Sequence, residues 1–169
     1  ALLVLMVTFG SLVASTMPIV TAVVGVGIGA LAILTTTHWV ELNDVTPVLA
    51  VMIGLAVGID YSLFILSRYR QERRHLPGPE AAGMAVGTAG SSVVFAGTTV
   101  FVALVALVLA GIEFLSWMGL AAAFTVLVSV LVALTMLPAL LGAWGERAFG
   151  LKIPGIAGNA GPGPRPGRN

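Results

Sequence analysis

The chain of 169 residues is 58% hydrophobic and 9% charged, and it contains no cysteine. A soluble domain carries about 25% charged residues, so a soluble core of this size could not bury so much apolar surface, and lipid is the expected solvent. The formal net charge of +1, without a basic patch interleaved with aromatics, gives no sign of nucleic acid binding, and the lack of cysteine excludes disulfides and thiolate chemistry.

Five apolar segments predict an all-α fold, a polytopic transmembrane helix bundle. They cover residues 1–13, 18–36, 47–69, 81–110 and 114–144. The first is too short to cross a bilayer, which takes about 20 residues. Ala1 also opens directly into apolar residues, without the charged leader of a signal peptide. We therefore expect that the chain begins inside a helix of a longer protein.

Proline and polar residues mark the expected starts of the second and third segments. A short turn is expected at residues 14–16, and Pro18 falls in the first helical turn after it, where the missing N–H costs nothing. Pro47 takes the same place in the third segment, and Asp44 or Thr46 can cap that helix. The short connections predict that neighbouring helices pack antiparallel.

The basic residues lie in the loop at residues 68–74 and in the C-terminal tail, whereas the loops at 37–44 and 111–113 carry no Lys or Arg. Positive charge favours the cytoplasmic side of a membrane. We therefore expect an outside N-terminus and a cytoplasmic C-terminus. The bundle is expected to cover residues 1–147, and the Gly/Pro-rich residues 148–169 should form a cytoplasmic tail or linker, because they cannot bury a core.

Asp60 is the only charged residue between positions 45 and 67, in the third segment. A carboxylate near the bilayer midplane costs at least about 2.5–3.5 kcal/mol and is functional by default. Tyr61 follows directly but lies about 100° round the helix, so each side chain is expected to find its partner on another helix. The pair predicts proton movement, and the alternative is a structural carboxyl that a hydroxyl keeps neutral.

Small residues recur every fourth position on the same segment, at Ala50, Gly54, Gly58 and Ser62. Such a stripe lets another helix approach closely in lipid, and packing is its simplest role. Asp60 lies about 160° away from Gly58 on the helix. One face of the segment is therefore expected to pack, and the opposite face to present the carboxylate.

The fourth segment offers Ser92 and Thr99 as hydroxyls for a proton relay, although such groups more often bond a carbonyl of their own helix. His38 and His75 lie far apart in expected loops, which is not a metal-ligand pattern, and the chain has no phosphate-binding glycine motif. The sequence therefore predicts no enzyme activity, no metal and no cofactor.

Four ordered runs are similar to the MmpL (mycobacterial membrane protein large) family of the resistance–nodulation–division (RND) superfamily. They read GIDYSLF, SRYRQE, GTAGSSVVF and FLSWMGL, and they begin at Gly58, Ser67, Gly87 and Phe114. The resemblance covers nearly all of the chain to about Arg147.

This resemblance implies a multi-pass protein of the bacterial cell (inner or plasma) membrane, driven by proton entry and exporting lipids or other hydrophobic compounds. It implies that the chain corresponds to helices two to six of the N-terminal half of a twelve-helix transporter. Asp60 would carry protons, and Tyr61 would be the ligand of an equivalent Asp-Tyr pair on the second repeat. Ala96 stands where some relatives carry serine, which leaves Ser92 or Thr99 to supply the hydroxyl.

The second repeat and the extracytoplasmic domains of the family are not among these residues, so the chain is not expected to transport anything alone. Its expected partners are the lipid bilayer, protons, the second repeat and a hydrophobic substrate. The alternative is a membrane sensing or scaffolding module that does not transport, such as a sterol-sensing-type bundle.

Overall fold

The computed structural model describes residues 12–39 and 42–148, and within these ranges the side chains from 16 to 143. Four long helices make up this part of the chain, which contains no strand: α2 (Leu12–Thr36), α3 (Val45–Glu72), α4 (Gly78–Val105) and α5 (Glu113–Ala148), with a short 3-10 helix η1 (Ala106–Ala110) extending α4. All four are long and apolar enough to cross a membrane. The predicted all-α polytopic bundle is confirmed, while the short first segment falls almost wholly outside the described residues.

The start of α2 differs from the prediction. The turn expected at residues 14–16 is helical, and Pro18 lies inside the helix rather than in its first turn. Proline removes one hydrogen bond of the helix ladder, but membrane helices tolerate it where neighbouring helices pack around it. Pro18 is fully buried in the bundle, so tertiary packing overrides the local signal.

The start of α3 is close to the prediction, but its capping differs. Asp44 takes the N-cap position without a side-chain capping bond. The Asn43 side chain accepts a hydrogen bond from the Val45 N–H at 3.1 Å instead. The Thr46 hydroxyl is buried and finds no partner among the described residues. The helix therefore begins near Pro47 as expected, although neither predicted side chain caps it.

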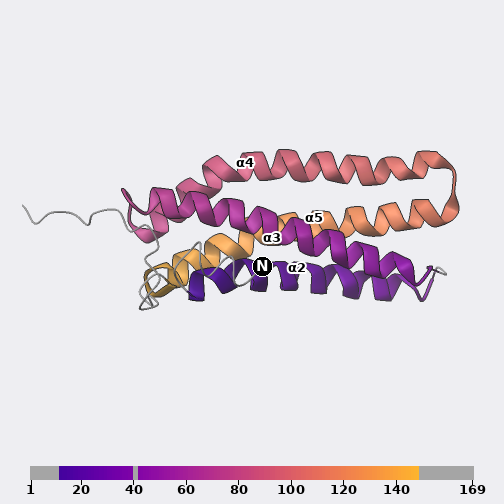
Figure 1. Ribbon diagram of the computed structural model, residues 1–169, viewed down its shortest axis with the longest axis horizontal. Helices are drawn as coiled ribbons and strands as arrows, with labels where there is room; N and C mark the ends of the chain where they lie inside the picture. Colours follow the sequence, from indigo (N-terminus) through magenta and orange to yellow (C-terminus); the bar gives the residue numbers. More distant parts are fainter. Residues whose placement is uncertain (1–11, 40–41, 149–169) are drawn as a thin grey trace, which may run out of the picture.

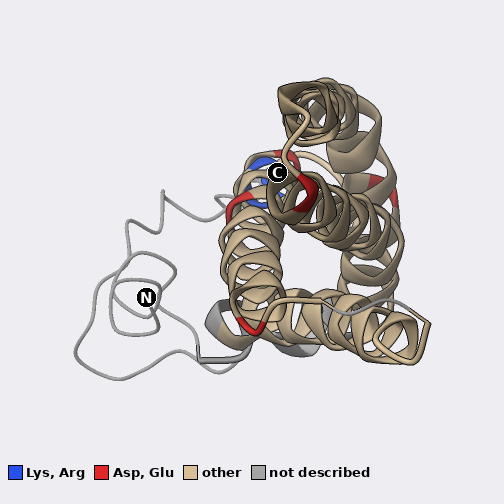
Figure 2. Cartoon of the chain, turned by 90° about the vertical axis from the view of Figure 1, so that its right-hand side faces the viewer, with Lys and Arg blue, Asp and Glu red and all other residues tan. Residues whose placement is uncertain are grey.

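Each helix runs antiparallel to the one before it, as expected from the short loops (Figure 1). The middle of the bundle is formed by α3 and α5, which touch each other and both outer helices, whereas α2 and α4 make no contact with each other in the described residues. Figure 2 looks along the bundle and shows the helices side by side around one axis. This arrangement places α5 between α2 and α4 and leaves one long face of α4 open.

The two ends of the bundle differ in charge. One end, here called the acidic end, carries Asp44 before α3 and Glu113 at the start of α5, and it faces the viewer in Figure 2. The other, here called the basic end, carries four arginines where α3 finishes: Arg68, Arg70, Arg73 and Arg74. The charge asymmetry noted in the sequence is thus an asymmetry between the ends of the folded bundle.

Side chains of α5 fit against glycines of α2. A Cβ atom on Gly29 would lie 2.8 Å from Thr125 Cγ2, and one on Gly25 would lie 3.2 Å from Ser129 Cα. Both distances are shorter than an ordinary carbon–carbon contact of about 3.5–4.0 Å. The two helices therefore approach so closely that glycine is needed on α2, as in other small-residue contacts within membranes.

The stripe of small residues on α3 faces the same centre. Ala50, Gly54, Gly58 and Ser62 are all buried. A Cβ on Gly54 would overlap Thr125 Cγ2, and one on Gly58 would lie 3.1 Å from Ala22 Cβ on α2. This face of α3 is thus packed against α2 and α5, which leaves the opposite face for other contacts.

The outer surface is strongly apolar. Large hydrophobic side chains stand exposed on every helix, for example Leu31, Met52, Phe95 and Leu131. Water would not favour such a continuous apolar surface, whereas the hydrocarbon of a bilayer matches it. The chain is a multi-pass membrane protein, and any polar group on this surface needs an explanation.

Candidate functional site

A groove between α3 and α4 is lined in part by Asp60, the only charged residue of α3 before Arg68. Its volume is about 290 Å³, and it is lined by Asp60, Tyr61, Phe64, Ser92, Val93 and Ala96. Asp60 is exposed on the face of α3 that lies opposite the buried Gly58. The structure therefore brings three of the predicted site residues, Asp60, Tyr61 and Ser92, to one place.

Small residues of α4 allow this close arrangement. A Cβ on Gly97 would lie 3.6 Å from Tyr61 Cε2 and 2.7 Å from Val130 Cγ2 of α5. The tyrosine ring therefore lies against the backbone of α4, and α4 in turn presses against α5. Ala96, the neighbour of Gly97, adds only a methyl group to the lining of the groove.

Asp60 lies deep within the span and has no partner in the described part of the chain. It is the sixteenth residue of α3, about 22 Å from the start of the helix at 1.5 Å per residue. It forms no hydrogen bond or ion pair with the described residues. A carboxyl in this position can take up and release a proton, and its charged form needs a polar partner from outside these helices.

The two candidate hydroxyls of α4 lie in different surroundings. Ser92 lines the groove with Asp60. Thr99 is not part of the groove, and its Oγ1 donates to the Phe95 carbonyl of its own helix at 2.9 Å. The two residues are seven positions apart, about two helical turns, but only Ser92 lines the groove. Whether either hydroxyl takes part in a relay stays a prediction.

Sequence reasoning missed two residues along this face, Phe64 and Arg68. Phe64 lines the groove one helical turn beyond Asp60. Arg68 follows one turn later, and its Nε donates to Thr88 Oγ1 of α4 at 3.2 Å. The spacing of four residues from Asp60 to Phe64 to Arg68 marks one helix face and could have identified both. From the sequence alone, Arg68 indicated the orientation of the helices and no contact with α4.

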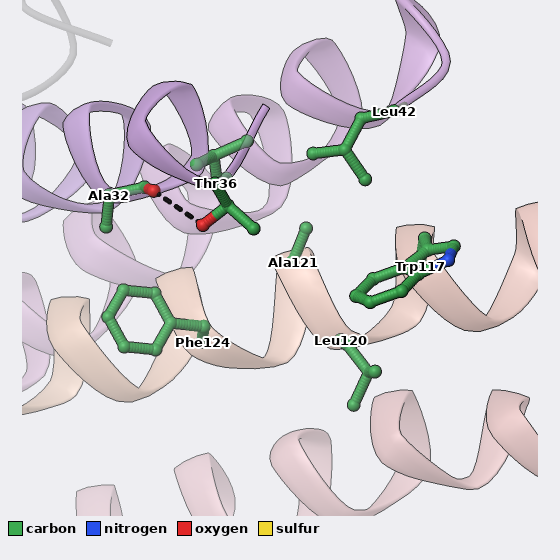
Figure 3. Close-up of a pocket in the computed structure, with 8 residues that line it drawn as sticks. Ala32, Thr36, Leu42, Trp117, Leu120, Ala121 and Phe124 are labelled. Atoms are coloured by element: carbon green, nitrogen blue, oxygen red, sulfur yellow. Dashed lines mark hydrogen bonds between the residues drawn. The ribbon is translucent and has the colours of Figure 1, made fainter. Parts of the chain in front are cut away.

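A second cavity lacks the groups needed for chemistry. It occupies about 190 Å³ between α2 and α5 near the acidic end (Figure 3). Its lining is almost wholly apolar, and it includes Leu42, Trp117 and Phe124. The Thr36 hydroxyl is turned to the Ala32 carbonyl of its own helix at 2.9 Å. No titratable side chain lines this cavity, and no cluster of metal-ligating side chains occurs in the described residues.

The apolar helices and the groove between α3 and α4 show to which class of protein the chain belongs. The protein is a polytopic helical membrane protein, and Asp60 and Tyr61 are among the residues that line a groove within its span. Comparison with known proteins then gives the family. The profile described as "MMPL family" matches residues 1–155, and the chain belongs to this family. The family indicated by the sequence motifs is thereby confirmed.

Three relatives illustrate the similarity. "Membrane protein YdfJ" of Bacillus subtilis (strain 168) is 47% identical over 148 residues, which cover 87% of this chain and 20% of the relative. "Mycolic acid-containing lipids exporter MmpL11" of Mycolicibacterium smegmatis is 37% identical over 152 residues, with coverages of 87% and 16%. "Heme uptake protein MmpL11" of Mycobacterium tuberculosis (strain H37Rv) is 37% identical over 150 residues, with coverages of 87% and 15%. The chain spans about a fifth or less of the length of these relatives.

Proposed function

We propose that this chain is part of a proton-driven exporter of the RND superfamily that moves lipids or other hydrophobic compounds across a bacterial cell membrane. In this proposal, Asp60 and Tyr61 are one half of the proton relay within the membrane. The other half is an equivalent pair on a second repeat, which covers the groove between α3 and α4. The chain corresponds to helices two to six of the first repeat and does not transport alone.

One observation carries the proposal: Asp60 is exposed deep within the apolar span of α3, without a partner in the described residues. A packed structural carboxyl would be buried against a hydroxyl of the same bundle. Instead, the buried face of α3 carries the small residues, and the carboxyl faces outward. Intramembrane carboxyls of this kind pair with a second element or with water and mark proton paths.

The names of the relatives support the class of substrate. One relative is named an exporter of lipids that contain mycolic acid, and another is named a heme uptake protein. Both names refer to large hydrophobic or amphipathic molecules that a membrane protein moves. We assign export to this chain by analogy with the first name, and family membership favours a transporter over an enzyme.

The charge asymmetry supports an orientation. The basic end carries Arg68, Arg70, Arg73 and Arg74, and the acidic end carries Asp44 and Glu113. Because short cytoplasmic loops are enriched in Lys and Arg, we place the basic end in the cytoplasm. The C-terminal tail then starts on the cytoplasmic side, and the N-terminus lies outside.

The test is transport by the full-length protein that carries this chain, reconstituted into vesicles under an imposed pH gradient. Asp60→Asn nearly preserves the shape but cannot bind and release a proton, so proton-driven transport is expected to stop. Asp44→Asn makes the same chemical change outside the span and should leave transport unchanged. Wild-type transport by Asp60→Asn at matched protein levels would reduce Asp60 to a structural carboxyl and remove the basis of the proposal.

The same assay separates the exporter from a sensing or scaffolding module. A sensor would bind a hydrophobic ligand without moving it, whether or not a pH gradient is present. Substrate accumulation that follows the gradient and collapses with a protonophore supports the exporter. Ligand binding without accumulation supports the sensor instead.

A further inference from the structure

Arg68 makes three polar contacts at the basic end of the groove. Its Nε donates to Thr88 Oγ1 of α4 at 3.2 Å, and its Nη1 donates to Gln71 Oε1 at 3.1 Å. Its Nη2 lies 3.0 Å from Glu72 Oε1, which neutralises the charge of the guanidinium. The Arg68 side chain therefore holds two acceptors of its own helix and one acceptor of the neighbouring helix at the same time.

Thr88 is well suited to accept this bond. Its hydroxyl donates to the Met84 carbonyl at 2.8 Å, so its proton is directed along α4 and a lone pair is free for Arg68. A hydroxyl has one donor and two acceptor positions, and this geometry uses both functions. A hydrogen bond that involves a charged donor is stronger than one between neutral groups.

The contact lies in line with the groove. On α3, Asp60, Phe64 and Arg68 follow one another at intervals of one turn, and Arg68 is about 12 Å from Asp60 along the axis. On α4, Ser92 and Thr88 follow in the opposite direction, because the two helices are antiparallel. The groove lining finishes with Phe64 and Ser92. The Arg68–Thr88 bond therefore crosses between the helices one turn beyond the last lining residues, on the side of the basic end.

The part of α4 around Thr88 packs through small residues. Ala81, Ala82, Ala85, Ala89 and Gly90 are all buried. Because their side chains are short or absent, each makes little contact area with the neighbouring helices. The hydrogen bond from the charged Arg68 therefore adds a directional link between α3 and α4 at a place where the side-chain contacts are small.

We propose that the Arg68–Thr88 bond is a clasp that closes the Asp60 groove toward the basic end, and that Arg68 is a positioning residue controlling access of water to Asp60 from that side. The clasp keeps α4 against α3, and Phe64 lies between Asp60 and Arg68 along the same face of α3. Loss of the clasp lets α4 move away from α3 at this end, which opens a water path to Asp60. The inference rests on the proposed proton relay, because only a relay needs controlled access.

Arginine is required for this role because its planar fork binds acceptors on two helices at once. Arg68→Lys keeps the positive charge beside Glu72 but has no Nε–H to reach Thr88 while the ion pair is held. Thr88→Val keeps the size of the side chain and removes the acceptor, and Thr88→Ser restores it. These three variants distinguish the clasp from a simple charge effect.

The experiment measures access to the groove directly. A cysteine-free version of the full-length protein receives Ala96→Cys, because Ala96 lines the groove beside Asp60. A water-soluble, membrane-impermeant methanethiosulfonate is added to the basic end or to the acidic end in vesicles of known orientation. Thr88→Val is expected to speed labelling from the basic end about tenfold, equivalent to about 1.4 kcal/mol, and to leave labelling from the acidic end unchanged.

Three comparisons control the result. Arg68→Lys should speed labelling like Thr88→Val, whereas Thr88→Ser should label at the rate of the parent. Thr135→Val removes an exposed hydroxyl of α5 that bonds only its own helix, to Leu131, and Arg74→Gln removes an exposed loop arginine. Both of these should leave the rate unchanged.

Unchanged labelling rates in Thr88→Val and Arg68→Lys would overturn the clasp. Faster labelling from both ends would also overturn it, because that result indicates a general loosening of the helix bundle. The labelling rates and the transport assay can fail separately, so the clasp and the proposed function are tested apart. If Asp60→Asn blocks transport and Thr88→Val leaves labelling unchanged, the relay stands and the clasp fails. If Asp60→Asn transports normally while Thr88→Val opens the groove, the clasp stands as a structural contact, and its role in a relay fails with the proposed function.

Discussion

Gly54 is the position where the packing of α3 can be tested most sharply. It lies on the buried face opposite Asp60. A Cβ at this position would overlap Thr125 Cγ2 and lie 3.2 Å from Val26 Cγ2. Thr125 cannot simply turn its methyl group away, because its Oγ1 donates to the Ala121 carbonyl at 2.9 Å. Leucine at position 54 would therefore push α3 away from α2 and α5.

The expected cost of Gly54→Leu follows from two opposing effects. Overpacking of a filled core costs about 1–3 kcal/mol, and four added carbons place this variant at the upper end. Replacing a helical glycine gains about 1 kcal/mol of helix propensity. The net destabilisation is therefore about 2 kcal/mol. Gly87→Leu is the matched control, because nothing lies within 4 Å of a Cβ there, and it should stabilise the helix by about 1 kcal/mol.

The assay is thermal unfolding of the full-length protein in detergent, followed by the loss of the monodisperse peak in size-exclusion chromatography. Gly54→Leu should unfold at a lower temperature than the parent, and Gly87→Leu at an equal or higher temperature. Equal unfolding temperatures for the two variants would refute the close approach of three helices at Gly54. That result would also remove the reason for Asp60 to face outward.

Two further predictions concern the site and the orientation. Tyr61→Phe should slow proton-driven transport about two- to tenfold. The substitution removes one hydrogen bond worth about 0.5–1.5 kcal/mol but leaves the carboxyl of Asp60 in place. A complete loss of transport would instead assign the proton step to Tyr61 itself. An impermeant thiol reagent added to intact cells should label His38→Cys but not His75→Cys. Both histidines are exposed, and His38 lies at the acidic end, which we place outside, whereas His75 lies at the basic end, which we place in the cytoplasm. The reverse labelling pattern would invert the topology.

The length and polarity of the apolar segments were enough to predict the helical bundle. Hydrocarbon thickness sets the length of a spanning helix, and polar backbone groups in lipid must bond within that helix. The outward position of Asp60 followed from the angle between it and the stripe at Gly54 and Gly58. Helix length, and the angle between two residues on one helix, depend on that helix alone, so both can be predicted from the sequence.

Other features depend on how helices meet, and the sequence did not predict them. Pro18 has the local signal of a helix start, but packing by neighbouring helices keeps it inside α2. The Arg68–Thr88 bond requires the register between α3 and α4, and periodicity within either helix does not give it. Thr99 lies seven residues after Ser92, but it falls nearly one turn beyond Ala96, the last residue of α4 that lines the groove.

Proton passage through Asp60 is the step on which the proposed function depends. The most direct test is the rate of proton entry into vesicles that contain the full-length protein and a trapped pH-sensitive dye, with substrate present on the side from which it is exported. The account predicts that substrate speeds acidification by the parent and by Asp44→Asn, and has no effect on Asp60→Asn. Substrate-dependent acidification by Asp60→Asn at the rate of the parent would contradict the account.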